Sequence, residues 1–248
     1  KSVKLEQVAS GQDMMIPFTS TAITSGKVYA SALVKVNAVA DDVYFFVLLQ
    51  PTSAGIVDGK APVENARLLA SKCDTEGKFV FKISRNSATL FETTGEYELG
   101  GTYLVVMSYE FVDGTKNDII RLWVNPVTSG AEPEPTIAIN SATHTGADMS
   151  KIQGLELRQG SSATKTGPAV VVDAIHVGTA WGDLFDSAPV AEPSMIVTPH
   201  VTYDGSPVAI GQQATYATYT VEYANLTEAV SVYVTGANSD QFEVSEGS

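Results

Sequence analysis

Residues 28–36 read VYASALVKV, and this stretch decides the fold. Apolar side chains occupy every second position, from Val28 through Ala32 to Val36. A strand points successive side chains to opposite faces, so this period of two predicts a strand with one buried face. The neighbouring apolar run, residues 43–49 (VYFFVLL), predicts a strand that is buried on both faces.

Further segments rich in Val, Ile, Tyr and Phe follow along the chain and predict more strands. These segments are residues 67–72, 78–84, 102–111, 118–125, 152–159 and 169–177. Turn-forming pairs such as Asp113-Gly114 and Asn125-Pro126 separate them. No segment has a convincing apolar period of 3.6 residues. The pattern therefore predicts an all-β fold, an antiparallel sandwich or jelly roll.

The composition excludes several classes of protein. Of the 248 residues, 44% are hydrophobic and 17% are charged, which favours a packed core over disorder. The formal net charge of −13 argues against nucleic acid and anionic lipid as main partners, because both attract clustered basic residues. No apolar run is long enough to span a membrane. The single cysteine, Cys73, excludes an internal disulfide framework.

The charge is unevenly distributed along the chain. Residues 1–165 hold all 15 Lys and Arg residues, whereas residues 166–248 hold 10 acidic residues and no basic one. The proline-bearing stretch DSAPVAEP (residues 186–193) follows this change in charge. Together they predict a jelly-roll domain over residues 1–187, a linker over 188–193 and a small, truncated β module over 194–248. Because the chain starts at Lys1 without a leader, we expect an exported protein whose signal has been removed.

Three stretches resemble a known family. TYLVVMSYEFVDGTKNDIIRLWVNP (102–126), IQGLELRQG (152–160) and AVVVDAIHVGTAWGDLF (169–185) are similar to concanavalin A-like, laminin-G-like jelly-roll domains of secreted or surface Bacteroidetes proteins. The tail, residues 219–245, resembles the first part of an immunoglobulin-like repeat. The resemblance implies an extracellular or cell-surface protein with further domains in a longer parent chain, in which the jelly roll binds a ligand or acts as a spacer.

Relatives of this fold include β-glucanases, whose catalytic carboxylates lie on one strand face in a Glu-x-Asp-x-x-Glu arrangement. This sequence has no such pattern. The nearest acidic group, Glu92, Glu96 and Glu98, lies around a turn marked by Gly95 and Gly100. We therefore expect that the chain is not an enzyme, and a glycoside hydrolase is the least favoured alternative.

One loop offers oxygen ligands for calcium. Residues 113–118 (DGTKND) place Asp113, Asn117 and Asp118 close together, and Ca²⁺ prefers carboxylate and carbonyl oxygens on loops. The resemblance adds to this reading, because laminin-G-like domains often bind calcium. Asp-Gly and Asn-Asp pairs are also common turn formers, so a plain turn between two strands is the alternative. We predict no cofactor other than this calcium.

Aromatic side chains offer a surface for sugar stacking. Alternation along residues 119–124 places Arg121 and Trp123 on the face opposite the core. With Tyr103 or Tyr109 from the neighbouring strand, they would form an exposed platform for a sugar ring. The alternative is that Trp123 packs between the sheets and Arg121 pairs with an acidic residue.

These observations favour a non-catalytic surface or secreted protein that binds carbohydrate or mediates adhesion, with a glycan or another extracellular ligand as its partner. A structural spacer in a larger surface protein is the alternative, because the incomplete tail fits a spacer equally well. An exposed aromatic patch beside a pocket would favour binding, and a flat, pocketless face would favour the spacer.

Overall fold

The computed structural model describes residues 2–53, 55–56, 63–85, 88–160, 165–185, 194–201 and 217–224, and the single positions 209, 212, 231, 233 and 235. Contacts divide the chain into two compact units, Lys1–Asp186 and Ser187–Ser248. In the parts described, each unit is built from its own antiparallel strands.

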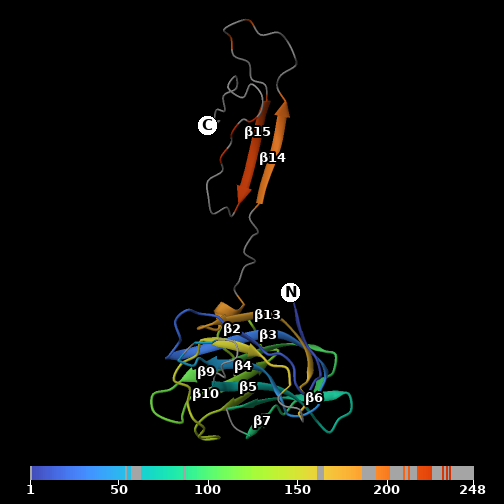
Figure 1. The fold of residues 1–248 in the computed structure, drawn as a ribbon, viewed down its shortest axis with the longest axis vertical. Helices are drawn as coiled ribbons and strands as arrows, with labels where there is room; N and C mark the ends of the chain where they lie inside the picture. The colour runs from blue at the N-terminus through green and yellow to red at the C-terminus, as the bar shows by residue number, and fades with distance from the viewer. Residues whose placement is uncertain are drawn as a thin grey trace. The chain divides into compact units, whose positions relative to one another are not determined.

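In the described part of the first unit, two antiparallel sheets form a sandwich (Figure 1). The first sheet contains, in spatial order, β1 (Val3–Leu5), β13 (Ala169–Gly178), β3 (Gly26–Ala38), β9 (Thr102–Phe111), β10 (Ile119–Val124) and β11 (Ile137–Ile139). The second contains β2 (Met14–Pro17), β12 (Gly154–Leu157), β4 (Tyr44–Gln50), β5 (Val63–Lys72), β6 (Lys78–Ser84) and β7 (Leu90–Glu92), with β8 (Tyr97–Glu98) also paired to β6.

The alternation that predicted β3 matches its burial. Val28, Ala32 and Val36 are fully buried in the core, whereas Leu33 on the other face is 40% exposed. Tyr29 also lies on that other face, yet it is buried as well. It is covered by a second, smaller apolar cluster on the outside of the first sheet, which contains the two tryptophans.

The main core lies between the two sheets and contains apolar side chains from both of them. Phe45, Phe81 and Leu155 of the second sheet are buried there together with Met107 and Leu122 of the first. Among the described residues, the only helical element is a short 3-10 turn, η1 (Gly182–Leu184). The predicted all-β antiparallel sandwich is therefore confirmed.

The second unit contains β14 (Ser194–Val201) and β15 (Ala217–Ala224), which pair in antiparallel register with Ser194 opposite Ala224. The predicted linker, residues 188–193, lies outside the described residues, as does much of the tail. The immunoglobulin-like character of the tail and the domain boundaries remain predictions. In the part of the chain that the structure describes, we find no apolar helix of bilayer-spanning length.

Candidate functional site

The predicted sugar platform on β10 is buried. Trp123 points to the outer face of the first sheet, as its alternation predicted, but only 1% of its surface is exposed. The Trp181 ring lies over it at a centroid distance of 5.1 Å, and the Tyr29 ring lies at 6.3 Å. The Trp123 indole nitrogen donates a hydrogen bond to Pro133 O. The expectation of an exposed Trp123 is therefore wrong, because the chain after β13 returns and covers it.

The two tyrosines of the predicted platform lie on the opposite face of the sheet. In the β9–β10 register, Ser108 stands beside Arg121, and Tyr103 and Tyr109 point inward. Tyr109 is fully buried, and the ring of Tyr103 packs against aromatic side chains of the core. Arg121 pairs with Glu110 at 2.5 Å. The four predicted residues are thus divided between the two faces and form no common surface.

The predicted calcium loop is held by hydrogen bonds within the protein. Asp118 is buried, and its carboxylate accepts hydrogen bonds from the Tyr109 hydroxyl and from Val112 N. The Asn117 amide donates to Asp113 O at 2.8 Å. No group of three or more metal-binding side chains gathers within the described residues. Asp113, Asn117 and Asp118 therefore do not form a common set of metal ligands. The Asp118 side chain points inward, and its oxygens accept hydrogen bonds within the protein.

A buried arginine holds this end of the sandwich together. Arg85 is 1% exposed, and its guanidinium forms an ion pair with Asp148. The Asp148 carboxylate also accepts hydrogen bonds from the backbone N–H groups of Lys116 and Asp118. Arg85 and Asp148 therefore connect the end of β6 to the loop between β9 and β10.

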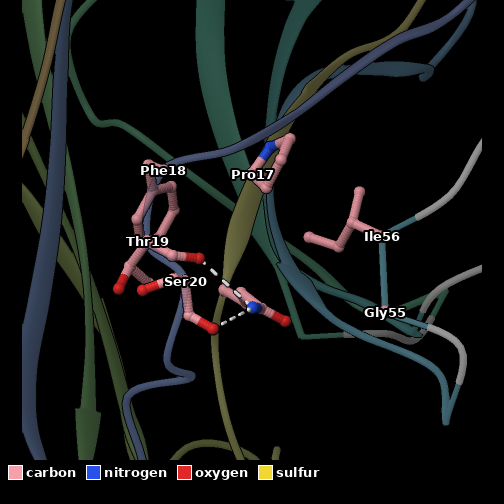
Figure 2. A pocket seen from close by; sticks show the side chains of 7 residues that line it. Pro17, Phe18, Thr19, Ser20, Gly55 and Ile56 are labelled. Atoms are coloured by element: carbon pink, nitrogen blue, oxygen red, sulfur yellow. Dashed lines mark hydrogen bonds between the residues drawn. The ribbon is translucent and has the colours of Figure 1, made fainter.

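An open groove of about 500 Å³ lies where β2 ends and β12 begins (Figure 2). Its lining combines apolar side chains, a hydroxyl-bearing turn and one amide side chain, from Pro17, Phe18, Thr19, Ser20, Gly55, Ile56 and Gln153. The Phe18 N–H donates to Gln153 O, and the Gln153 side-chain nitrogen donates to Thr19 O and Ser20 O. These bonds hold the turn after β2 against the start of β12.

The outer face of β12 leads from this groove to a carboxyl group. Leu155 and Leu157 are buried in the core, so the alternating Gly154 and Glu156 point outward. Ile56 of the groove covers Gly154 so closely that a Cβ there would lie 2.1 Å from Ile56 Cδ1. Glu156 follows on the same face and is fully buried.

Glu64 on β5 is the centre of a hydrogen-bonded network on this face. Its Oε2 accepts a hydrogen bond from the Tyr44 hydroxyl and lies 3.1 Å from Arg158 Nη1 and 3.5 Å from Arg67 Nη2. Both guanidinium groups stack on the Tyr44 ring, at 4.4 Å for Arg67 and 4.3 Å for Arg158. The network covers Glu156, which stands beside Val47 in the sheet register. We call these five charged or aromatic residues, Tyr44, Glu64, Arg67, Glu156 and Arg158, the carboxyl–guanidinium cluster.

The environment of Glu156 keeps it protonated. Its pKa is raised from 4.5 to about 8, and burial is the largest cause; the negative charges of Glu64 and Asp13 also raise the pKa, whereas Arg67 lowers it. Among the described residues no N–H or O–H group donates to its buried oxygens, and a side-chain hydrogen bond with the neighbouring Asp13 favours the protonated form. Glu156 therefore carries a proton at neutral pH, and this makes it a group that can donate or accept one near pH 8.

This cluster was not predicted from the sequence. Glu64 and Glu156 are far apart in the sequence. The pairing of β12, β4 and β5 places them in one sheet, where the charge of Glu64 raises the pKa of Glu156. One signal was present: Glu156 stands between two leucines in the short segment GLEL, where an ionised side chain is unfavourable. The groove had no comparable signal, because its lining residues are ordinary turn and strand-end residues.

Replacing Gly154 with alanine is expected to destabilise the first unit by about 1–3 kcal/mol. The new Cβ would lie 2.1 Å from Ile56 Cδ1, which can move, and 2.9 Å from Ile16 O, which is backbone. Urea denaturation measures the change. Gly95→Ala is the matched control, because a Cβ there meets only Tyr97 Oη at 3.9 Å. Equal effects of the two substitutions would contradict the close packing at Gly154.

No family model and no curated protein matches the chain. Solved structures resemble its fold. A SAP-like pentraxin from Limulus polyphemus is 12% identical and covers 76% of this chain and 82% of its own, with a TM-score of 0.44. The globular domain of T. cruzi calreticulin is 12% identical and covers 71% and 72%, with a TM-score of 0.39. The likeness concerns the fold alone, an antiparallel jelly-roll sandwich.

The expectation that the chain is not an enzyme is wrong. The structures of similar fold include a mutant of Trypanosoma rangeli sialidase displaying trans-sialidase activity, 14% identical over 64% of this chain, with a TM-score of 0.38. The matched region spans 22% of the sialidase chain. The expectation depended on a motif within one strand, whereas Glu64 and Glu156 come from different strands. The missing motif therefore does not exclude catalysis.

Proposed function

We propose that the chain binds a carbohydrate through the groove between the end of β2 and the start of β12, as part of an extracellular or cell-surface protein. The chemical composition of the groove lining supports this proposal. Pro17, Phe18 and Ile56 supply apolar surface, and Ser20 and Gln153 supply a hydroxyl and an amide. Binding sites for small molecules combine an apolar lining with a few placed polar groups, and sugars offer both C–H faces and hydroxyls. The resemblance of residues 102–185 supports the extracellular setting.

The groove is held in shape before any ligand binds. The Gln153 backbone and side chain together make three hydrogen bonds to the turn 18–20. The neighbouring Ile23 and Ile152 exchange two backbone hydrogen bonds of 2.8 Å each. A site that is already ordered loses less conformational freedom on binding, which favours affinity for a small, polar ligand.

A glycan array is expected to give at least one hit with the wild-type chain, and Ser20→Trp is expected to weaken that hit by more than about tenfold. Ser20 is exposed and lines the groove, so an indole at this position obstructs the groove without disturbing the core. Ser129→Trp, on an exposed loop outside the groove, is the matched control and should leave binding unchanged. If no glycan binds, the spacer function replaces this proposal.

The same array tests the calcium prediction when it is repeated with a chelator. Asp118 already accepts hydrogen bonds from Tyr109 and Val112. We therefore expect glycan binding to be the same in calcium and in chelator. A hit that disappears on chelation would show that this loop, or another site, holds calcium in the bound state.

A further inference from the structure

The orientation of the Gln153 side-chain amide is determined by its neighbours. Its nitrogen donates to Thr19 O at 3.2 Å and to Ser20 O at 3.1 Å, and Figure 2 shows both bonds as dashed lines. Backbone carbonyl oxygens only accept hydrogen bonds, so the amide nitrogen must face them and the amide oxygen must face away. The group that Gln153 offers to a ligand is therefore Oε1, an acceptor.

The other hydroxyl groups of the turn are not equivalent. The Thr19 hydroxyl donates to Thr21 O at 2.9 Å and accepts from Thr21 N at 3.2 Å, so it is engaged within the turn. Ser20 is exposed and supplies a hydroxyl at the edge of the groove. A ligand thus meets one acceptor and one hydroxyl beside the apolar surfaces of Pro17 and Ile56.

The described residues that line the groove include no ionisable side chain. The nearest titratable group along the outer face of β12 is Glu156, which adds a negative charge when it ionises. The two arginines of the carboxyl–guanidinium cluster are already engaged with Glu64. The formal net charge of the whole chain is −13. A ligand carboxylate would therefore lose water without gaining a cation from the described residues of the lining, which is unfavourable.

We propose that the groove selects uncharged glycans over acidic ones, with Gln153 Oε1 accepting a hydrogen bond from a sugar hydroxyl. This inference rests on the proposed carbohydrate-binding function. A hydroxyl donor satisfies Oε1, whereas a carboxylate would place two acceptors against each other. Selectivity then arises from the fixed Gln153 amide and from the uncharged side chains of the described lining residues.

The test uses pairs of oligosaccharides that differ by one carboxylate: a neutral hit from the array, and the same sugar ending in a uronic acid. Isothermal titration of the full chain is expected to show affinity at least about tenfold lower for the acidic member. Ser20→Lys should reduce this difference, because it places a cation at the groove edge. Ser129→Lys makes the same change of charge outside the groove and should leave the difference unchanged.

The role of Gln153 is tested by removing sugar hydroxyls one at a time. One deoxy analogue of the neutral hit should bind the wild-type chain more weakly than the parent sugar does. On Gln153→Met, the analogue and the parent sugar should bind with equal affinity. Thermal unfolding confirms that this variant is folded. If no analogue behaves in this way, Gln153 is not the recognition group. Equal or tighter binding of acidic sugars overturns the selectivity but leaves carbohydrate binding intact. If no sugar of either kind binds, both proposals fail.

Discussion

Replacing Asp148 with asparagine is expected to lower the free energy of unfolding by about 3–5 kcal/mol, because the substitution leaves the buried charge of Arg85 without its ion-pair partner. Nε and Nη1 of Arg85 are buried and have no hydrogen-bond partner among the described residues, so the pair with Asp148 provides most of the compensation that these residues give to the charge. Chemical denaturation followed by circular dichroism measures the loss.

Asp74→Asn is the matched control for Asp148→Asn. It makes the same chemical change at an exposed position in the turn between β5 and β6, where we expect an effect within about 0.5 kcal/mol. Asp148 also accepts the N–H groups of Lys116 and Asp118, so amide exchange in the loop 112–118 should accelerate in the variant. Equal stability of the two variants would show that Arg85 is compensated by another group.

Replacing Glu156 with glutamine is expected to remove a large pH dependence of stability. The folded-state pKa of Glu156 is about 8 and its ordinary value is 4.5, so the folded chain binds the proton more tightly than the unfolded chain. The contribution of protonated Glu156 to the free energy of unfolding is therefore fully present below pH 4.5 and is lost as the pH rises through 8. The total loss is at most about 5 kcal/mol. Glutamine is neutral at every pH and has nearly the same shape, so the variant should be the more stable protein at pH 9.

Unfolding free energies of the wild type and of Glu156→Gln between pH 5 and 9 provide the measurement. The difference between the two proteins should grow with pH and level off above the pKa of Glu156. Glu76→Gln makes the same chemical change at an exposed turn position and is the matched control. A flat difference for Glu156→Gln would mean that water or a conformational change solvates this carboxyl group.

The fold could be predicted because its signal is local. The alternation over residues 28–36 is a direct consequence of strand geometry, and the structure buries Val28, Ala32 and Val36 in the core as expected. The same rule placed Trp123 on the outer face of its strand. It did not reveal that Trp181 covers this face, because that contact depends on where the chain goes after β13.

The candidate site could not be predicted in the same way. A search for paired carboxylates along one strand finds nothing near Glu156, because Glu64, whose charge raises the pKa of Glu156, lies on another strand with β4 between them. The position of the hydrogen-bond acceptor in the groove, Gln153 Oε1, also depends on how the chain folds. Gln153 is an ordinary polar residue in the sequence, and only its two bonds to the turn after β2 determine which atom it presents.

The order of residues along the chain was enough to predict antiparallel strands around an apolar core, because the period of two is a property of neighbouring residues. Which polar groups are buried, paired or offered to a ligand depends on the folded chain. Burial and electrostatic interaction depend on distances between strands. Glu76 is exposed at a turn, whereas Glu156 is fully buried within a sheet, where burial raises its pKa.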